Sequence, residues 1–411
     1  MRFNLTDFIN KCVTQRSSSL FLPDIQRFGQ VLSTRIDARS VLVIGGAGSI
    51  GTAFIKALLH YKPTKLVVVD TNENGLTELV RDLRSSLDYN IPATFLTYPI
   101  DFGDPVFEKL LRQEGPFDIV ANFAAHKHVR SEKDPYAMEA MLTNNVFKAK
   151  LLLDLLLKYK PERFFCVSTD KAANPVNVMG ASKKLMEQVI MAYSELLHIT
   201  TARFANVAFS NGSLPAGFLE RIAKQQPLSA PMDVERYFVS PEEAGQLCLL
   251  ACMLGNTGEI FFPKLDPKSD VQKFSTIATT LLQTLGYQAD ICNTEQEARE
   301  KAAQLSPESS TWPVYFFQSD TSGEKAYEEF YTENEIIDLE RFEALGVIRG
   351  NDCAGNRNTS NNHIAMAEMI TELKAIFQKD TLSKAAIIKT LEHYVPNFRH
   401  VETGRNLDSK M

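Results

Sequence analysis

The sequence predicts an α/β fold, in which a doubly wound parallel sheet is followed by a smaller lobe. Between residues 40 and 205, short runs rich in β-branched and aromatic residues alternate with helix-like stretches, which is typical of such sheets. The runs are apolar along their length, as strands buried on both faces are. After about residue 205 the alternation loosens, and prolines and glycines divide the chain into shorter segments, which favours a separate lobe.

The predicted elements follow one another along the chain. The first strand, Val41-Leu42-Val43-Ile44, leads through a glycine-rich turn into an apolar-periodic helix near residues 52–61. Further strands are expected over residues 66–69, 94–98, 119–123 and 163–168. Near the end of the chain, helices are expected over residues 363–378 and 382–394.

The glycine-rich turn carries the first functional signal. Glycines at positions 45, 48 and 51 allow a tight turn and the close approach of a pyrophosphate, while Ser49 and Ile50 begin a helix whose free N–H groups face the same point. Asp70 ends the second strand 19 residues after Gly51, where a carboxylate accepts hydrogen bonds from ribose hydroxyls. This arrangement predicts a Rossmann-type dinucleotide site.

The surroundings of Asp70 favour NAD and do not exclude NADP. Residues 71–74 contain no Arg or Lys that would meet a 2′-phosphate. The remaining cofactor contacts are expected from side chains near the ends of the neighbouring strands, namely Asn74, Asp101, Phe102, Ala124 and Ala125.

These patterns divide the chain into four parts. We expect a helical lead-in over residues 1–38 and the dinucleotide-binding domain over 39–205. Residues 206–349 are expected to form mainly the substrate-binding lobe, with a charged helical insert at 294–310. Residues 350–411 are expected to contain a linker and C-terminal helices.

A polar strip follows the fifth strand. It reads Ser168-Thr169-Asp170-Lys171, and Met179-Gly180-Ala181-Ser182-Lys183 comes shortly after it. An acid and a base placed side by side at the carboxyl end of a strand, beside the cofactor, suit proton-transfer chemistry.

Here the sequence resembles the extended short-chain dehydrogenases, whose signature is Tyr-x-x-x-Lys. Lys183 matches the lysine, but Met179 stands at the tyrosine position. The wider resemblance, over roughly residues 40–335, is to the UDP-N-acetylglucosamine 4,6-dehydratases, one branch of which has methionine there. The segments that carry it are 45–51, 125–129, 168–175, 177–183, 203–207, 236–238 and 322–325.

The resemblance implies the reaction and its residues. Hydride leaves sugar C4 for the nicotinamide, a base takes the C5 proton, an acid protonates the leaving C6 hydroxyl, and hydride returns to C6. It implies Asp170 as the acid and Lys171 as the base, provided that Lys171 is neutral, with Thr169 bonded to the C4 hydroxyl. Lys183 would hold the nicotinamide ribose. The acceptor of the C4 hydroxyl proton stays open, and Asp170 is one candidate.

The substrate is expected to be a UDP-hexosamine. Lys127 and His128 follow the fourth strand and should border the sugar, and no metal site is expected. The polar candidates for the phosphates are Asn206 and Arg236, which the resemblance favours, and Arg203 and Lys264. Glu324 and Lys325 are expected to close the lobe or to reach the nucleotide.

The composition excludes several classes of protein. A net charge of −6 is unsuited to general binding of nucleic acid or anionic membranes. The N-terminus has no signal-peptide pattern and no apolar run is long enough to span a bilayer, so a cytoplasmic enzyme without membrane insertion is expected. The six cysteines form no C-x-x-C pair and are expected to be free thiols. Homo-oligomerisation is expected by analogy.

Two other readings remain at this point. A nucleotide-sugar 4-epimerase would share the cofactor site, although such enzymes usually keep the tyrosine. A non-catalytic scaffold that binds the cofactor would account for Met179 and for the added terminal segments.

Overall fold

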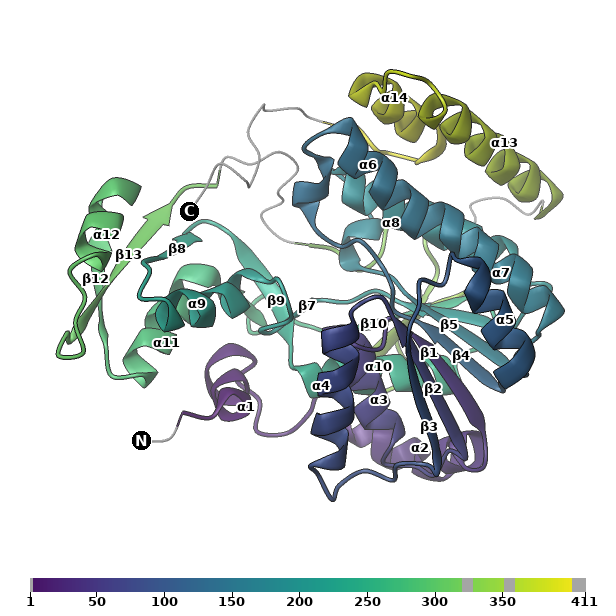
Figure 1. Ribbon diagram of the computed structural model, residues 1–411, viewed down its shortest axis with the longest axis horizontal. Helices are drawn as coiled ribbons and strands as arrows, with labels where there is room; N and C mark the ends of the chain where they lie inside the picture. Colours follow the sequence, from purple (N-terminus) through teal and green to yellow (C-terminus); the bar gives the residue numbers. More distant parts are fainter. Residues whose placement is uncertain (1–2, 320–327, 351–358, 401–411) are drawn as a thin grey trace.

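The computed structural model describes residues 3–319, 328–350 and 359–400. A large sheet is covered by helices on both faces, and a smaller lobe lies to one side of it (Figure 1). Helical segments at both ends of the chain pack onto these two bodies. The predicted α/β fold with a doubly wound sheet, a smaller lobe and helical extensions is therefore confirmed.

The large sheet has nine strands in the order β14-β15-β10-β6-β5-β4-β1-β2-β3. The strands from β3 to β10 are parallel, whereas β15 and β14 join the edge in antiparallel pairing. Their bounds are β1 (Ser40–Ile44), β2 (Lys65–Asp70), β3 (Thr94–Pro99), β4 (Ile119–Asn122), β5 (Arg163–Val167), β6 (Ile199–Ala202), β10 (Glu259–Pro263), β14 (Ile337–Asp338) and β15 (Leu345–Ile348). The strand order reverses between β1 and β4, which is where sheets of this type bind ligands.

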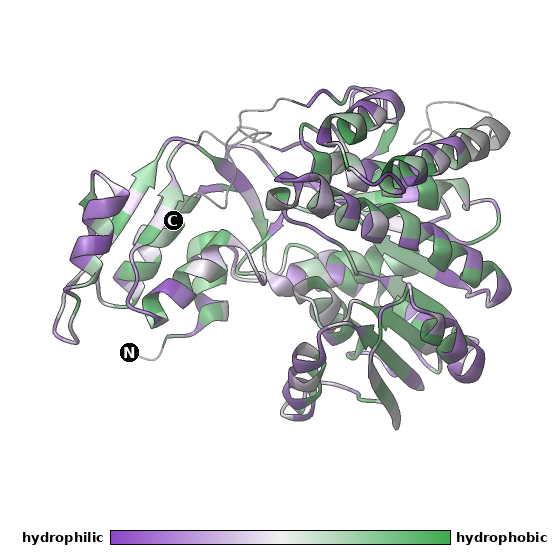
Figure 2. Ribbon diagram, turned by 45° about the horizontal axis from the view of Figure 1, so that its top comes forward, coloured by the Kyte–Doolittle hydropathy of each residue, from purple (hydrophilic) through white to green (hydrophobic). Residues whose placement is uncertain are grey.

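Side chains of each strand alternate between two apolar cores. In β1, Val41 and Val43 enter one core, and Leu42 and Ile44 enter the other, because successive residues of a strand point to opposite faces. The strands of this sheet are coloured mostly as hydrophobic, while its helices are hydrophobic on one side and hydrophilic on the other (Figure 2).

Each core is closed by its own layer of helices. The layer on the face of Val41 consists of α2 (Leu22–Ile36), α3 (Ser49–Leu58), α4 (Glu73–Arg84) and α10 (Pro241–Leu254). The opposite layer consists of α5 (Pro105–Glu114), α6 (Pro135–Leu142), α7 (Lys148–Lys158) and α8 (Val178–Ala192). Between α6 and α7 the chain forms one π-helical turn, Thr143–Phe147, a distortion often found at functional sites.

The smaller lobe contains two short sheets around a third core. Their strands are β7 (Asn206–Val207), β9 (Glu235–Val239) and β11 (Val271–Lys273), and β8 (Leu228–Pro231), β12 (Gln288–Cys292) and β13 (Thr311–Phe317). The helices of the lobe are α9 (Leu214–Ala223), α11 (Phe274–Thr284) and α12 (Glu295–Ala302). The insert expected at 294–310 thus contains α12, whose buried Ala298 and Ala302 pack it into the lobe.

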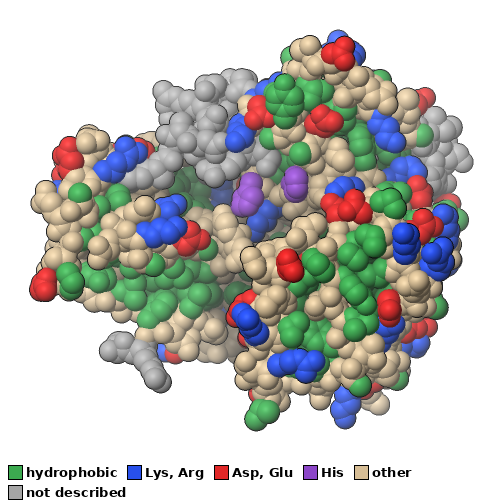
Figure 3. All heavy atoms as spheres, viewed as in Figure 1, with side chains coloured by type: hydrophobic (Ala, Val, Ile, Leu, Met, Phe, Trp, Pro, Cys, Tyr) green, Lys and Arg blue, Asp and Glu red, His purple; other side chains and the backbone are tan. Residues whose placement is uncertain are grey.

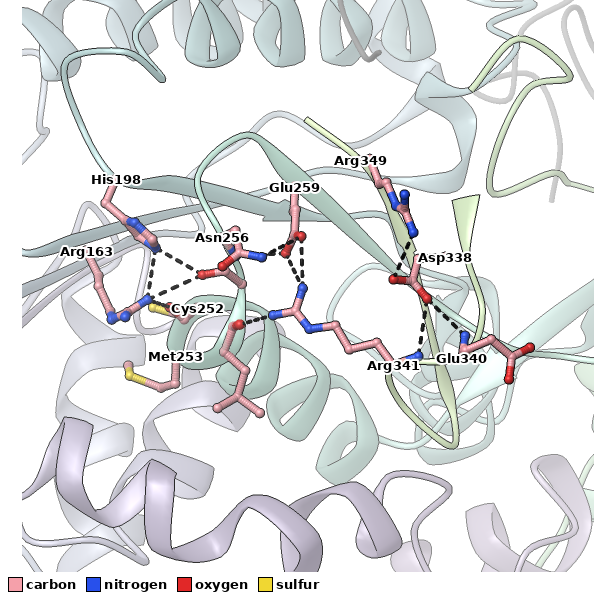
Figure 4. A network of polar contacts seen from close by, with 12 residues as sticks. Arg163, His198, Cys252, Met253, Asn256, Glu259, Asp338, Glu340, Arg341 and Arg349 are labelled. Carbon is pink, nitrogen blue, oxygen red and sulfur yellow. Dashed lines mark hydrogen bonds and ion pairs between the residues drawn. The ribbon is translucent and has the colours of Figure 1, made fainter. Parts of the chain in front are cut away.

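The chain returns to the large sheet within the segment expected to be mainly substrate lobe. Strand β10 and strands β14 and β15 all belong to the nine-stranded sheet. Arg341 fixes this return, because its guanidinium donates two hydrogen bonds to the carboxylate of Glu259, at 2.9 and 2.7 Å, and another to the carbonyl of Leu254 (Figure 4). A boundary at residue 205 therefore does not separate the two bodies cleanly.

The N-terminal segment contacts both bodies. Its first turns, α1 (Leu5–Phe8) and the π-helical Ile9–Val13, contribute to the core of the smaller lobe, whereas α2 packs on the large sheet. Between them, Arg16 bonds both carboxylate oxygens of Glu243, at 2.7 and 2.8 Å, and Asp270 at 3.0 Å. The lead-in therefore fastens the lobe to α10.

The C-terminal segment forms a helical hairpin, α13 (Thr359–Phe377) and α14 (Lys384–Tyr394). It packs on α6 and α8, on the outside of the second helix layer (Figure 1). Its apolar side chains, among them Leu373 and Leu391, are fully buried and extend that core. Helix α13 begins inside the linker expected at 350–362, and residues 351–358 of that linker lie outside the described residues.

Within the described ranges, no helix has both the length and the apolar composition required to cross a lipid bilayer. Cys166, Cys248, Cys252 and Cys292 are buried free thiols and Cys12 is a half-buried one, while Cys353 lies outside the described residues.

Replacement of Leu373 by alanine should show whether the hairpin folds as part of the domain. Leu373 is fully buried, so Leu373→Ala should lower the free energy of unfolding by about 2 to 5 kcal/mol. Urea unfolding followed by circular dichroism measures this loss. Gln378→Ala, at an exposed position near the end of α13, is the control and should change stability by less than about 0.5 kcal/mol. A similar small change in both variants would mean that the hairpin is not part of the cooperative unit.

Candidate active site

The glycine-rich turn approaches the end of β4 so closely that side chains are excluded from it. Gly45 has a φ of +75°, and a Cβ there would lie 2.5 Å from the backbone nitrogen of Ala124. A Cβ at Gly51 would lie 2.3 Å from the carbonyl oxygen of Gly45. The turn therefore needs glycine for its own packing, and it delivers the N-terminus of α3 to the carboxyl end of the sheet.

A pocket opens at this end of β1, β2 and β4, beside the turn. Its lining includes the predicted cofactor contacts Gly45, Gly48, Asp70, Asp101, Phe102, Ala124 and Ala125. The carboxylate of Asp70 is fixed by two backbone donors, Ala47 N–H at 3.0 Å and Asn72 N–H at 2.9 Å. The structure thus brings together a glycine turn, a helix N-terminus and a fixed carboxylate.

A second carboxylate, that of Asp101, lies on the other side of the pocket. Asp101 accepts a hydrogen bond from Gly103 N–H at 2.8 Å and an ion-pair hydrogen bond from Lys148 at 2.5 Å. Burial alone would raise the pKa of Asp101, but Lys148 and the backbone donor outweigh it and hold the pKa below its ordinary value. Phe102 is buried next to Asp101 in the chain. Lys148 Nζ lies over its ring, 5.8 Å from the ring centroid.

Five predicted cofactor residues are not among the residues that line the pocket: Ser49, Ile50, Gly51, Asn74 and Lys183. Ser49 and Gly51 belong to the first turn of α3, at the mouth of the pocket. Asn74 lies exposed in the first turn of α4, and it is not among the lining residues. Ile50 packs half-buried against the core from the same turn as Ser49.

Asp170 and Lys171 lie in a short 3-10 turn, Asp170–Ala172, that directly follows β5. Strand β5 pairs with β4, and residues 123–126 that follow β4 line the pocket. Three donors converge on Oδ1 of Asp170: the Thr169 hydroxyl at 2.7 Å, Lys171 N–H at 2.9 Å and Lys171 Nζ at 3.0 Å. The Asp170 side chain is only 3% exposed and that of Lys171 19%. The predicted acid/base pair is therefore a largely buried, directly bonded ion pair.

Two further charged groups complete this site. Glu328 lies 3.6 Å from Lys171 Nζ, and Arg236 on β9 lies 4.0 Å from the same carboxylate. Both side chains are more than nine-tenths buried. We name Asp170, Lys171, Arg236 and Glu328 the charge cluster.

The charge cluster keeps Lys171 protonated, in contrast to the neutral amine required of a resting base. Burial alone would lower the pKa of Lys171, but Asp170 and Glu328 outweigh burial and the opposing charge of Arg236, and the net pKa is above its ordinary value. The role of base predicted from the sequence requires a neutral Lys171. In the resting structure this requirement is not met.

Met179 and Lys183 lie one helical turn apart on α8, and both are buried. Met179 packs in the core of the second helix layer. Lys183 Nζ donates to the carbonyl of Val167 at 3.2 Å, at the end of β5, and burial lowers the pKa of Lys183. The predicted spacing therefore places an ammonium group beneath the strand that carries Asp170.

Arg203 is a structural residue and not a phosphate ligand. Its guanidinium is fully buried and forms two-point ion pairs with Glu187 of α8, at 2.9 and 2.8 Å, and with Glu335, at 2.9 and 2.8 Å. We name Arg203, Glu187 and Glu335 the buried triad. Lys264 is likewise occupied, since its ammonium group donates to the carbonyls of Leu339 and Phe342. Both sequence candidates are wrong because other parts of the chain satisfy their charges.

Asn206 is better placed for a ligand. Its Nδ2 is buried without a hydrogen-bond partner in the described part of the protein, which is costly for a polar group unless a ligand fills the position. Lys127 donates to the carbonyl of Asn211 at 2.8 Å, and Asn211 N–H donates to Ser49 Oγ at 2.8 Å. The loop at Asn211 thus connects the smaller lobe to both sides of the pocket.

Histidine side chains are exposed at the centre of the face where the smaller lobe meets the sheet domain (Figure 3). His126 lines the pocket, and His128 is exposed and lies against Gly212 of the smaller lobe. Lys127 and His128 directly follow His126 and are exposed, and their contact with a sugar stays a prediction. Glu324 and Lys325 lie outside the described residues.

Two site residues were missed in the sequence. Asn145, in the π-helical turn, bonds both backbone groups of His126 at 2.9 Å and the hydroxyl of Ser182 at 3.0 Å, and so ties the end of β4 to α8. The paired asparagines Asn144-Asn145 within an apolar helix were the available signal. Glu328 gave no comparable signal, because it lies far along the chain from Lys171.

Comparisons with known proteins agree with this architecture. Residues 41–349 match the family model described as polysaccharide biosynthesis protein. Uncharacterized membrane protein MJ1061 of Methanocaldococcus jannaschii is 32% identical over 336 residues, which are 80% of this chain and 91% of that protein. Probable polysaccharide biosynthesis protein EpsC of Bacillus subtilis is 29% identical over 74% of this chain, and the chain spans about half of its length, 47%.

A relative of named activity and a solved structure are also similar. UDP-N-acetylglucosamine 4,6-dehydratase (inverting) of Campylobacter jejuni is 29% identical over 260 residues, covering 61% of this chain and 72% of that enzyme. The structure of DesIV, a dTDP-glucose 4,6-dehydratase from Streptomyces venezuelae with NAD and TYD bound, is 20% identical with a TM-score of 0.54. It covers 71% of this chain and 88% of DesIV, which shows a shared fold.

The buried triad should give the protein a specific sensitivity to acid. Burial alone would raise the pKa of Glu187, but Arg203 lowers it from 4.5 to about 2. A depressed carboxyl pKa stabilises the fold fully above pH 4.5, and this stabilisation is lost as the pH falls towards 2. Its size is about 3 kcal/mol. Denaturant unfolding at several pH values should therefore show a steeper loss between pH 4.5 and 2 for the wild type than for Glu187→Gln.

The matched control is Glu195→Gln, at an exposed position just after α8, which should follow the wild type at every pH. At pH 7, Glu187→Gln should be less stable than the wild type by about 3 kcal/mol or more. The buried positive charge of Arg203 then has only one of its two carboxylate partners. Parallel pH curves for the wild type and Glu187→Gln would contradict this assignment.

Proposed function

Because the chain belongs to the polysaccharide biosynthesis protein family and has the fold of extended short-chain dehydrogenases that modify nucleotide sugars, we propose that it is an NAD-dependent 4,6-dehydratase. Its substrate is UDP-N-acetylglucosamine or a closely related nucleotide-hexosamine, and its product is the 4-keto-6-deoxy sugar used for glycan or polysaccharide synthesis. The observation that carries this proposal is the bonded Asp170–Lys171 pair, buried at the carboxyl end of β5 beside the pocket.

The residues around the pocket suit a dinucleotide. The N-terminus of α3 and the turn at Gly45 and Gly48 present backbone N–H groups to a pyrophosphate, and Asp70 has carboxylate lone pairs left for ribose hydroxyls. Lys183 is the candidate for the nicotinamide ribose. When bound, NAD would accept hydride from C4 of the sugar and return it to C6.

The chain's own residues supply the proton transfers. Oxidation at C4 releases the proton of the C4 hydroxyl, and Asp170 accepts it, directly or through the Thr169 hydroxyl that is bonded to it. With Asp170 protonated, Lys171 releases one proton to solvent. The C4 ketone acidifies C5–H, so Lys171, now a neutral amine, takes the C5 proton. Asp170 then protonates the C6 hydroxyl, which leaves as water. Lys171 finally returns its proton to C5. Asp170 is then a carboxylate again, and Lys171 regains its ammonium form by taking up one proton from solvent.

This order of events accounts for the protonated resting state of Lys171. Two carboxylates face its ammonium group and hold its pKa up. Protonation of Asp170 at the first step removes one of these negative charges, so the pKa of Lys171 falls at the moment when a base is needed. Arg236 and the unpartnered amide of Asn206 lie on the same side of the site and suit the nucleotide phosphates.

The reaction itself is the primary test. Purified protein with NAD and UDP-N-acetylglucosamine should yield a sugar nucleotide that has lost one water and has gained a C6 methyl group, as detected by mass spectrometry and NMR. In heavy water, deuterium should appear at C5. Lys171→Met should lower the rate by about 10²- to 10⁴-fold, and Lys224→Met, at an exposed position just after α9, should not. Recovery of unchanged sugar, or of its C4 epimer alone, would reject the dehydratase.

The cofactor assignment has its own test. Asp70→Ala should weaken NAD binding by about 10- to 100-fold, because hydrogen bonds from ribose hydroxyls to a carboxylate are lost. Asp70→Ala should also reduce the ratio of the affinity for NAD to the affinity for NADP, because the carboxylate that would repel a 2′-phosphate is gone. Isothermal titration calorimetry measures both affinities, and Asp104→Ala, an exposed residue before α5, is the control. Equal NAD affinity of Asp70→Ala and the wild type would exclude Asp70 from the site.

A further inference from the structure

Glu328 is a buried carboxylate for which the proposed proton transfers provide no role. Its Oε1 lies 3.6 Å from Lys171 Nζ and 4.0 Å from the guanidinium of Arg236. Its side chain is only 6% exposed. Removing a carboxylate from water is costly unless opposite charges compensate it, and here two cations do so.

Glu328 is held in this position by the segment that follows it. The carbonyl of Phe330 accepts a hydrogen bond from Arg203 at 2.9 Å, and Glu335 forms the two-point ion pair with the same guanidinium. The ring of Phe330 packs against Tyr237 of β9 and Phe262 of β10. The backbone two residues after Glu328 is therefore anchored in the core, and Glu328 does not depend on a loose loop for its placement.

The four members of the charge cluster carry equal numbers of positive and negative charges. Asp170 and Glu328 supply two negative charges, and Lys171 and Arg236 supply two positive charges, with each side chain less than one-fifth exposed. The charged groups that face Lys171 come from three places, Asp170 in its own turn, Arg236 on β9 and Glu328. Loss of any one of these charges removes a close Coulomb interaction in a poorly solvated site, where such interactions are strong.

We propose that Glu328 is a positioning residue that joins Lys171 to Arg236 and sets the charge state of Lys171. Because Asp170 changes its charge during the reaction proposed above, Glu328 is the permanent counter-ion of Lys171. It returns the amine to its ammonium form after each turnover. It also lies between Lys171 and Arg236. A change in the charge or position of one of these cations therefore alters the electrostatic energy of the other. The role of Glu328 in turnover rests on the proposed function. Its electrostatic effect on Lys171 does not.

The direct test measures Lys171 without any turnover. Trace labelling of the full-length protein with acetic anhydride over a pH series, followed by mass spectrometry of the peptide containing Lys171, gives the pH at which this amine loses its proton. Glu328→Gln should move that midpoint down by about one pH unit or more, because an opposite charge 3.6 Å from the ammonium group has gone. Glu329→Gln, whose carboxylate accepts from Asn174 at 2.8 Å, is the matched neighbour and should leave the midpoint unchanged.

A second variant separates charge from folding. Glu328→Asp keeps the negative charge on a shorter side chain, so its midpoint should lie between those of the wild type and Glu328→Gln. Thermal unfolding of each variant shows whether the labelled protein is folded. An unchanged midpoint in folded Glu328→Gln, or equal midpoints in Glu328→Gln and Glu328→Asp, would overturn the inference.

Kinetics then distinguish this inference from the proposed function. If the dehydratase reaction occurs, the rising limb of kcat against pH should move to lower pH in Glu328→Gln. KM should rise because the carboxylate 4.0 Å from Arg236 has gone. A structural role alone would lower kcat without moving the limb, and this result would also overturn the inference. If the midpoint of labelling moves but no nucleotide-hexosamine is dehydrated, the proposed function fails while the coupling of Glu328 to Lys171 stands.

Discussion

The active site depends on one buried interaction, the pairing of Arg203 with two carboxylates. Glu187 comes from α8, Glu335 comes from the segment before β14, and Arg203 directly follows β6. Glu187 also accepts a hydrogen bond from Ser168 at 2.6 Å, beside the catalytic turn. A single guanidinium therefore fixes the end of the sheet, the helix with Lys183 and the segment with Glu328. Two-point pairing suits this role because it defines orientation as well as distance.

The second constraint is the location of charge at the end of a parallel sheet. The apolar strands bury both faces, so polar side chains collect where the strands end, at Asp70, Asp101 and Asp170. Each of these carboxylates accepts at least one backbone N–H, which fixes its direction before any ligand arrives. Such preorganisation lowers the cost of ordering when a charged ligand binds. The smaller lobe adds Arg236 and Asn206 from the other side, so the complete site requires both bodies.

The sequence was sufficient for features that local patterns encode. The strand runs, the turn at 45–51 and the Asp170–Lys171 pair could be placed because period, glycine spacing and residue order are local properties. The roles of Arg203 and Glu328 could not, because each depends on a partner more than 100 residues away in the chain, Glu335 for Arg203 and Lys171 for Glu328. Arg203 looked like a phosphate ligand since an arginine pattern does not reveal whether its charge is already compensated. Asn74 lies exposed in the first turn of α4, and its contact with a cofactor stays a prediction.

The C-terminal hairpin has a consequence for assembly. A homo-oligomer built through the helices that flank the sheet would need α6 and α8 on the surface, but α13 and α14 already lie on them. The hairpin therefore covers the surface of α6 and α8 on that face. Self-association on that side must use the outer surface of the hairpin itself, so the geometry of any oligomer would differ from one in which bare α6 and α8 helices pair.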